Sequence, residues 1–188
     1  MVRVKLIILF LILPLLSFAQ DKIDDYYSSE LGRKFNIRAS SDQINQPTIY
    51  LEVFTGILKD THYFKLGNER TAFIKALEQA KIQFVSWKNS VKENNVSHAL
   101  KRMDITFPLV EIYAYDGIDQ TFKYLETLEL KPIFSVLGNN QCRFQLSAVS
   151  TLSNELAYSI LFTKEKEFNK LSSKISAEIV LRKIEMVK

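Results

Sequence analysis

Cysteine is almost absent from this chain. Its 188 residues include a single cysteine, Cys142, so no disulfide can form within the chain. Cys142 alternates in phase with Phe144, Leu146 and Ala148, which is typical of one buried face of a strand. We therefore interpret Cys142 as a small buried side chain rather than a reactive thiol. Stability is expected to come from a hydrophobic core instead of covalent links.

Histidine and glycine are also scarce, and this limits the chemistry that the chain can support. His62 and His98 are the only histidines, neither belongs to a metal-binding repeat, and we expect both at the surface. Five glycines are too few for Gly-rich phosphate loops, and no Gly-x-Ser-x-Gly nucleophile motif is present. We expect no metal and no cofactor. Whether the chain is an enzyme stays open, and the sequence favours a non-catalytic role.

Long apolar runs are missing except at the N-terminus. There the stretch from Leu6 to Leu16 follows two basic residues and precedes Ser17-Phe18-Ala19, the layout of a cleavable signal peptide over residues 1–19. An uncleaved membrane anchor is the alternative, but this run would span only about half of a hydrocarbon core. The sequence therefore predicts export, to the periplasm or the medium, after cleavage near Ala19. No stable membrane insertion is expected once the leader is removed.

Charge of one sign is not in excess once the leader is removed. The full chain carries a net charge of +4, but Arg3 and Lys5 belong to the leader, and the remainder holds 23 basic and 21 acidic residues. A nearly balanced surface offers no general attraction for polyanions. We therefore expect no nucleic-acid partner.

Alternation of apolar and polar residues predicts a chain rich in strands. Residues 20–33 are polar and are expected to form a flexible lead-in to a single domain over residues 34–188. Residues 121–130 are ambiguous between a strand and a short helix. The remaining predicted strands cover 34–39, 48–54, 62–66, 104–115, 132–137, 141–149 and 155–162.

Helical periodicity is strongest over residues 69–94. Apolar residues, Trp87 among them, recur there at spacings of three and four, and a second helical pattern covers residues 164–187. A coiled coil is an alternative for the first segment, but its bulky seam favours packing on a sheet. The order of elements predicts an α+β fold. We expect a mostly antiparallel sheet, with one long central helix and a C-terminal helix packed on one face.

The candidate binding residues lie on two predicted strands, on the sides opposite to their most apolar phases. If these strands pair, their aromatic rings and carboxylates form one surface that could bind a protein, a peptide or a glycan. The alternative is that the rings form a second covered face. The residues are Tyr50, Glu52, Phe54, Glu111, Tyr113 and Tyr115.

These features lead to a hypothesis with two rivals. We expect an exported, non-catalytic domain that binds a protein, peptide or glycan partner through the aromatic face of its sheet. A small secreted hydrolase is the first rival, because a pair among Glu52, Glu111, Asp116 and Asp119 could converge with carboxyl groups about 5–10 Å apart. A structural or assembly subunit is the second rival.

Overall fold

The computed structural model describes residues 21–40, 47–56, 61–138, 140–151 and 157–187. These residues form an α+β fold of ten strands and three helices, which confirms the predicted fold class. The strands are β1 (Asp21–Ser28), β2 (Arg33–Ser40), β3 (Thr48–Val53), β4 (Thr61–Leu66), β5 (Ala99–Arg102), β6 (Val110–Asp116), β7 (Thr121–Leu128), β8 (Lys131–Val136), β9 (Cys142–Val149) and β10 (Ala157–Phe162). The helices are α1 (Arg70–Glu93), α2 (Glu165–Lys174) and α3 (Ala177–Val187).

The strands form two antiparallel sheets. Six strands follow the order β1-β2-β3-β4-β6-β7, and four follow the order β10-β9-β8-β5. The sheets meet where Phe54, just after β3, exchanges two backbone hydrogen bonds of 2.9 and 2.8 Å with Ser159 of β10. One hydrophobic cluster includes buried residues from both sheets and all three helices.

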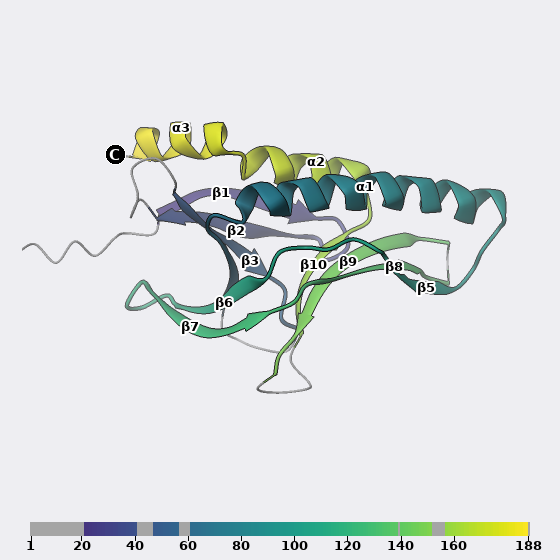
Figure 1. Cartoon of the computed structure of the whole chain (residues 1–188), viewed down its shortest axis with the longest axis horizontal. Helices are drawn as coiled ribbons and strands as arrows, with labels where there is room; N and C mark the ends of the chain where they lie inside the picture. The colour runs from purple at the N-terminus through teal and green to yellow at the C-terminus, as the bar shows by residue number, and fades with distance from the viewer. Residues whose placement is uncertain (1–20, 41–46, 57–60, 139, 152–156, 188) are drawn as a thin grey trace, which may run out of the picture.

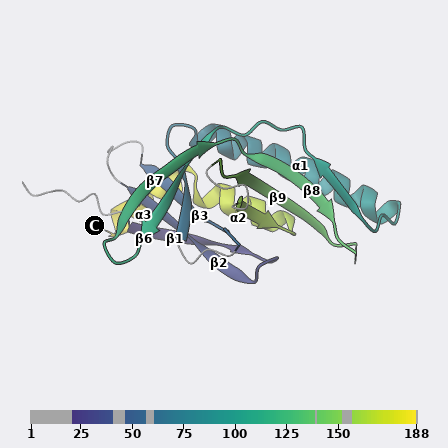
Figure 2. The ribbon, with the colours of Figure 1, turned by 90° about the horizontal axis from the view of Figure 1, so that it is seen from below.

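The helices lie along one side of the sheets, as the sequence predicts (Figure 1). The apolar seam of α1 is buried at Phe73, Leu77, Ala80 and Phe84, and it packs on the sheets and on α2. The apolar seam is therefore covered by the rest of the fold, as expected for packing on a sheet rather than for a coiled coil. Trp87 is half-buried, with its ring edge-on to Phe134 at 5.3 Å. Seen from below, the strands lie in front of the helices (Figure 2).

The polar segment after residue 20 is ordered, which corrects the expected flexible lead-in. It forms β1, an edge strand paired with β2. Tyr26 enters the core and stacks on Phe35 at a ring distance of 5.3 Å. Asp24 and Asp25 meet lysines of the helices and of β2, so their charges have partners although the segment contains few apolar residues.

Two other expectations on element boundaries were wrong in part, and one ambiguous stretch is settled. The strand predicted over 104–115 begins only at Val110, and a separate strand, β5, precedes it at 99–102. The predicted C-terminal helix breaks into α2 and α3 near Ile175, whose side chain is fully buried. The ambiguous stretch 121–130 contains strand β7.

The predicted signal peptide, residues 1–19, lies outside the described residues. Among the helices that the structure describes, none is long and apolar enough to span a bilayer.

Candidate functional site

A layer of aromatic rings covers the side of the six-stranded sheet that faces away from the helices. The strand register sets this layer: Tyr63 of β4 lies opposite Tyr113 of β6, and Tyr113 and Tyr115 lie opposite Tyr124 and Phe122 of β7. Successive strand residues point to opposite faces, so these side chains share one face. We call this layer the aromatic face and define it by Tyr50, Tyr63, Tyr113, Tyr115, Phe122 and Tyr124.

Phe122 is the central ring of the aromatic face. Its ring centroid lies 4.3 Å from that of Tyr50, 5.0 Å from Tyr63 and 4.9 Å from Tyr115. The rings of Tyr50 and Tyr115 are tilted against Phe122, and Tyr63 meets it edge-to-face, an arrangement that aromatic quadrupoles favour. The rings therefore form one packed cluster that joins β3, β4, β6 and β7.

The aromatic face becomes more accessible toward the last strand of the sheet. Tyr63 and Tyr50 are only 1% and 5% exposed, whereas Tyr113 and Phe122 are half-buried and Tyr124 is 51% exposed. β7 is the end strand of the sheet in the part of the chain that the structure describes. A partner would therefore reach the rings of β6 and β7 first.

Lys65 and Glu111 form an ion pair of 2.9 Å beside the rings. The Tyr113 hydroxyl donates a hydrogen bond of 2.8 Å to the Glu111 carboxylate. Burial alone would raise the pKa of Glu111, but the hydrogen bonds from Lys65 and Tyr113 outweigh burial and lower it. The pKa of Lys65 is raised, because the contacts with Glu111 and Tyr113 outweigh the opposite effect of burial. Both groups are therefore charged at neutral pH.

Cations cover part of the ring surface. The guanidinium carbon of Arg38 lies 4.3 Å from the centroid of Tyr115, and the Lys65 ammonium lies 5.4 Å from that of Tyr113. Arg38 also contacts Tyr63, whose pKa is raised mainly by burial. These contacts are cation–π interactions, and they hold the rings in fixed positions.

Four of the six predicted site residues come together: Tyr50, Tyr113 and Tyr115 in the ring cluster, with Glu111 beside it. The two predicted strands do not pair with each other, however, because β4 lies between β3 and β6. The sequence could not specify this order, since strand pairing depends on contacts that are distant along the chain.

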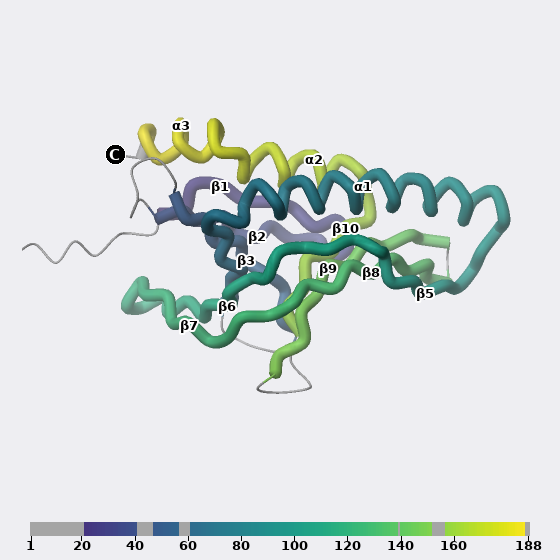
Figure 3. The backbone as a smooth tube through the Cα atoms, in the orientation of Figure 1, coloured from purple at the N-terminus to yellow at the C-terminus, as the bar shows by residue number. Residues whose placement is uncertain are grey.

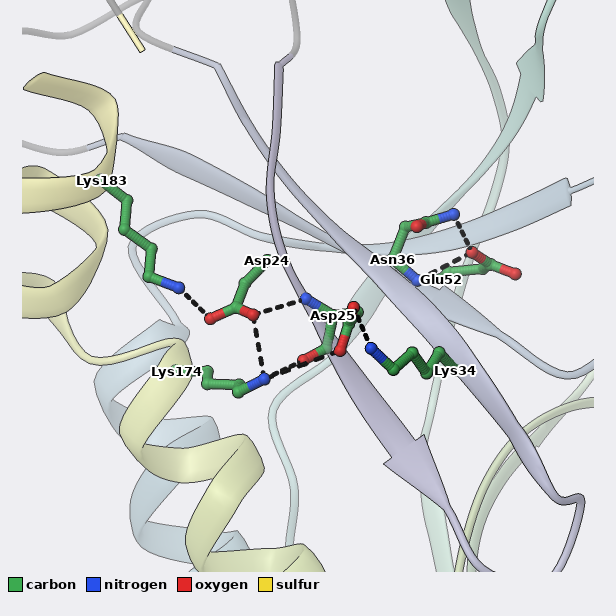
Figure 4. Close-up of polar contacts among 7 residues, drawn as sticks. All are labelled: Asp24, Asp25, Lys34, Asn36, Glu52, Lys174 and Lys183. Atoms are coloured by element: carbon green, nitrogen blue, oxygen red, sulfur yellow. Dashed lines mark hydrogen bonds and ion pairs between the residues drawn. The ribbon is translucent and has the colours of Figure 1, made fainter. Parts of the chain in front are cut away.

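Glu52 and Phe54 serve the fold rather than an open surface. The Glu52 side chain accepts hydrogen bonds from the backbone and side-chain nitrogens of Asn36, at 2.8 and 2.6 Å (Figure 4). Glu52 also forms an ion pair with Arg33 at 2.8 Å. It fills the gap at which β2 separates from β3. Phe54 forms the bridge between the sheets.

Sequence reasoning missed Tyr63, Phe122 and Tyr124. Tyr63 alternates with His62 and Phe64 in a predicted strand, so its face could have been assigned from the phase. Phe122 and Tyr124 lie in the stretch that was ambiguous between strand and helix, and neither residue could be assigned to a face until that choice was made.

Three of the four carboxylates of the hydrolase rival are engaged with other groups of the fold. Asp116 accepts hydrogen bonds from the backbone nitrogens of Ile118 and Asp119 in an exposed turn, at 2.8 and 3.3 Å. Glu52 is held by Arg33 and Asn36, and the lowered pKa of Glu111 is opposite to what a general acid needs. The arrangement gives no support to acid–base hydrolysis.

His62 is 4% exposed, which corrects its expected surface position. It lies on the core side of β4, with its ring 5.4 Å from that of Tyr158. His98 is exposed, as expected. In the described part of the chain, no three His, Cys, Asp or Glu residues are grouped so that they could hold a metal ion.

A second polar cluster fastens the C-terminal helices to β1 (Figure 4). The Asp24 carboxylate accepts hydrogen bonds from the ammonium groups of Lys174, at 2.9 Å, and Lys183. Burial alone would raise the pKa of Asp24, but these two cations outweigh burial and lower it. The charges of this cluster satisfy one another, so its role is structural.

No protein-family model, curated protein or solved structure matches the chain.

Proposed function

We propose that this protein is an exported, non-catalytic domain that binds a protein partner through the aromatic face of its six-stranded sheet. The observation that carries the proposal is the ring cluster on β6 and β7, which runs from the half-buried Phe122 to the exposed Tyr124 at the end of the sheet. Tyrosine is enriched at the centres of protein interfaces, because it combines a large apolar surface with a polar hydroxyl.

The cations on the rings favour a protein over a glycan. A sugar stacks flat on an open ring face, whereas Arg38 lies over Tyr115 and Lys65 lies near Tyr113. A protein partner can contact ring edges and hydroxyl groups without displacing these cations. It can also place polar side chains against the charged Lys65–Glu111 pair.

Export completes the proposal, and it rests on the three-part pattern of residues 1–19. The partner would then be another protein outside the cytoplasm.

The proposal can be tested by site-specific photo-crosslinking in cells that make the protein. A photoreactive phenylalanine analogue replaces either Tyr124, at the exposed margin of the aromatic face, or Ile82, an exposed side chain of α1. We expect a discrete protein adduct from position 124 and none from position 82. Tyr113→Ala in the same chain should weaken the adduct by disturbing the rings beside Tyr124. Equal adducts from both positions, or none from position 124, would refute the proposal.

A further inference from the structure

The connections between the two sheets enclose a pocket that the aromatic face does not include. The pocket has a volume of about 620 Å³ and lies between residues 102–109, which lead from β5 into β6, and the turn at Glu129 and Leu130 between β7 and β8. A volume of this size falls within the range of ligand-binding sites.

The pocket results from a mismatch in length between the two connections. Arg102 pairs with Ile133 in the four-stranded sheet, and Val110 pairs with Leu128 in the six-stranded sheet. Between these pairs one connection has seven residues, 103–109, and the other has four, 129–132. The two connections run side by side in the backbone trace (Figure 3). The longer one must bulge away from the shorter one, and this opens the pocket.

The floor of the pocket is apolar. Met103, Phe107 and Leu130 are buried, and Ile105 is half-buried. Burial alternates along 103–107 with the period of a strand. At the rim, Leu109 is 62% exposed and adds apolar surface beside the floor.

The backbone of residues 104–109 makes no backbone hydrogen bond to any part of the chain that the structure describes. Just before it, the nitrogen of Met103 still donates to the oxygen of Pro132 at 2.9 Å, so pairing stops where the bulge begins. Of the charges at the rim, Arg102 pairs with Glu129 at 3.5 Å, whereas Asp104 has no ion-pair partner among the described residues.

We propose that this pocket binds an extended peptide whose apolar side chain enters the pocket and whose neighbouring lysine or arginine meets Asp104. The peptide backbone pairs with residues 104–107, because a second extended chain offers donors and acceptors to the backbone groups that this stretch leaves unpaired. Pairing ends at Pro108, which has no backbone N–H. A compact apolar ligand would fill the floor but leave these backbone groups to water. The acidic charge of Asp104 selects the basic neighbour.

Panning a phage-displayed library of linear peptides about ten residues long against the protein tests this inference. We expect enriched clones to share an apolar residue next to a lysine or arginine. Leu109→Asp should raise the Kd of the synthetic consensus peptide at least about tenfold, because the substitution puts a charge at the apolar rim. Asp104→Lys should shift the selected neighbour from basic to acidic.

Matched controls separate these effects from misfolding and from general charge. Ile82→Asp makes the same kind of change at another exposed apolar site, and Asp119→Lys makes the same charge change in an exposed turn. Both should bind the consensus peptide like the unmodified protein. Circular dichroism should show the same thermal midpoint for all four variants.

Backbone pairing is tested on the peptide itself. Methylation of peptide nitrogens that face residues 104–107 should weaken binding about threefold to tenfold for each hydrogen bond, and methylation of alternate nitrogens should have little effect. The inference is overturned if no clone is enriched, or if the peptides bind Leu109→Asp and Asp104→Lys unchanged. Peptides that lose affinity only for Tyr124→Ala would support the aromatic face and would count against the pocket.

Discussion

At the scale of single residues, Glu126 shows how a buried carboxylate can connect two parts of a fold. It lies on β7, and its oxygens accept hydrogen bonds from the Ser150 hydroxyl at 2.5 Å and from the Thr151 nitrogen and hydroxyl at 2.9 Å. Tyr158 of β10 also contacts this carboxylate, and burial followed by the charge of Glu126 raises the pKa of Tyr158 to about 12. Glu126 therefore links the six-stranded sheet to the four-stranded one.

Replacing Glu126 by glutamine should destabilise the protein by about 1–3 kcal/mol at neutral pH, because a neutral amide with one acceptor oxygen replaces the carboxylate that accepts charge-assisted hydrogen bonds from Ser150 and Thr151. Urea unfolding of the variant measures this loss. Glu129→Gln is the matched control, since Glu129 is exposed and its contact with Arg102 is long. That variant should change the free energy of unfolding by less than about 1 kcal/mol. Equal effects of the two variants would contradict the role of Glu126.

The effect of Glu126→Gln should depend on pH. Burial alone would raise the pKa of Glu126, but the hydrogen bonds from Ser150 and Thr151 outweigh burial and lower it. Because the pKa is lower in the folded state, the ionised carboxylate stabilises the protein at pH values above the pKa of the unfolded state. This stabilisation is lost as the pH falls through the pKa of the folded state. The difference in free energy of unfolding between the unmodified protein and Glu126→Gln should therefore shrink below about pH 4. A difference that stays constant down to low pH would rule out this titration.

At the scale of elements, α1 shows what a sequence determines locally. Its apolar spacing predicted both the helix and its buried side, because helical periodicity involves residues only three or four positions apart. The detail at Trp87 was less predictable. If the Trp87 ring were fully buried, Trp87→Ala would lower the free energy of unfolding by about 3–5 kcal/mol. The ring is instead half-buried, between Phe134 and the Lys101 ammonium.

Two substitutions one turn apart on α1 test this difference. Phe84 is fully buried between Phe134 and Phe168, so Phe84→Ala should cost about 3–5 kcal/mol. Trp87→Ala should cost less, about 1–3 kcal/mol, since part of its ring already meets water. Urea titrations followed by circular dichroism give both values. A larger cost for Trp87→Ala than for Phe84→Ala would place Trp87 deeper in the core than the structure does.

The strands show where local reasoning ends. Local sequence pattern located β2, β3, β4, β8 and β9 well, because short runs rich in β-branched and aromatic residues mark a strand even where both of its faces are buried, as in β3 and β4. It could not place β4 between β3 and β6, so only part of the aromatic face was assembled from the sequence. It also missed β1, where Asp24 and Asp25 are held by lysines distant along the chain, the farthest being Lys174 and Lys183.

At the scale of the whole molecule, the two sheets share one core. The buried cluster includes Phe64 of the six-stranded sheet, Phe144 of the four-stranded sheet and Phe168 of α2. The bridge at Phe54 and the contacts of Glu126 add backbone and polar links between the sheets. Neither sheet could lose its packing without exposing the apolar face of the other.

This shared core, which includes Tyr26 of β1, predicts that the chain from β1 to α3 unfolds as a single domain in one cooperative transition. The fluorescence of Trp87, the one tryptophan of the chain, reports on α1 and β8. The absorbance of the tyrosines reports largely on the six-stranded sheet, whose aromatic face contains five of the eight tyrosines. In a urea titration both signals and the circular dichroism of the backbone should give the same midpoint and the same slope. Separate midpoints for tryptophan and tyrosine would show that the sheets unfold independently, and the prediction of one domain would then be wrong.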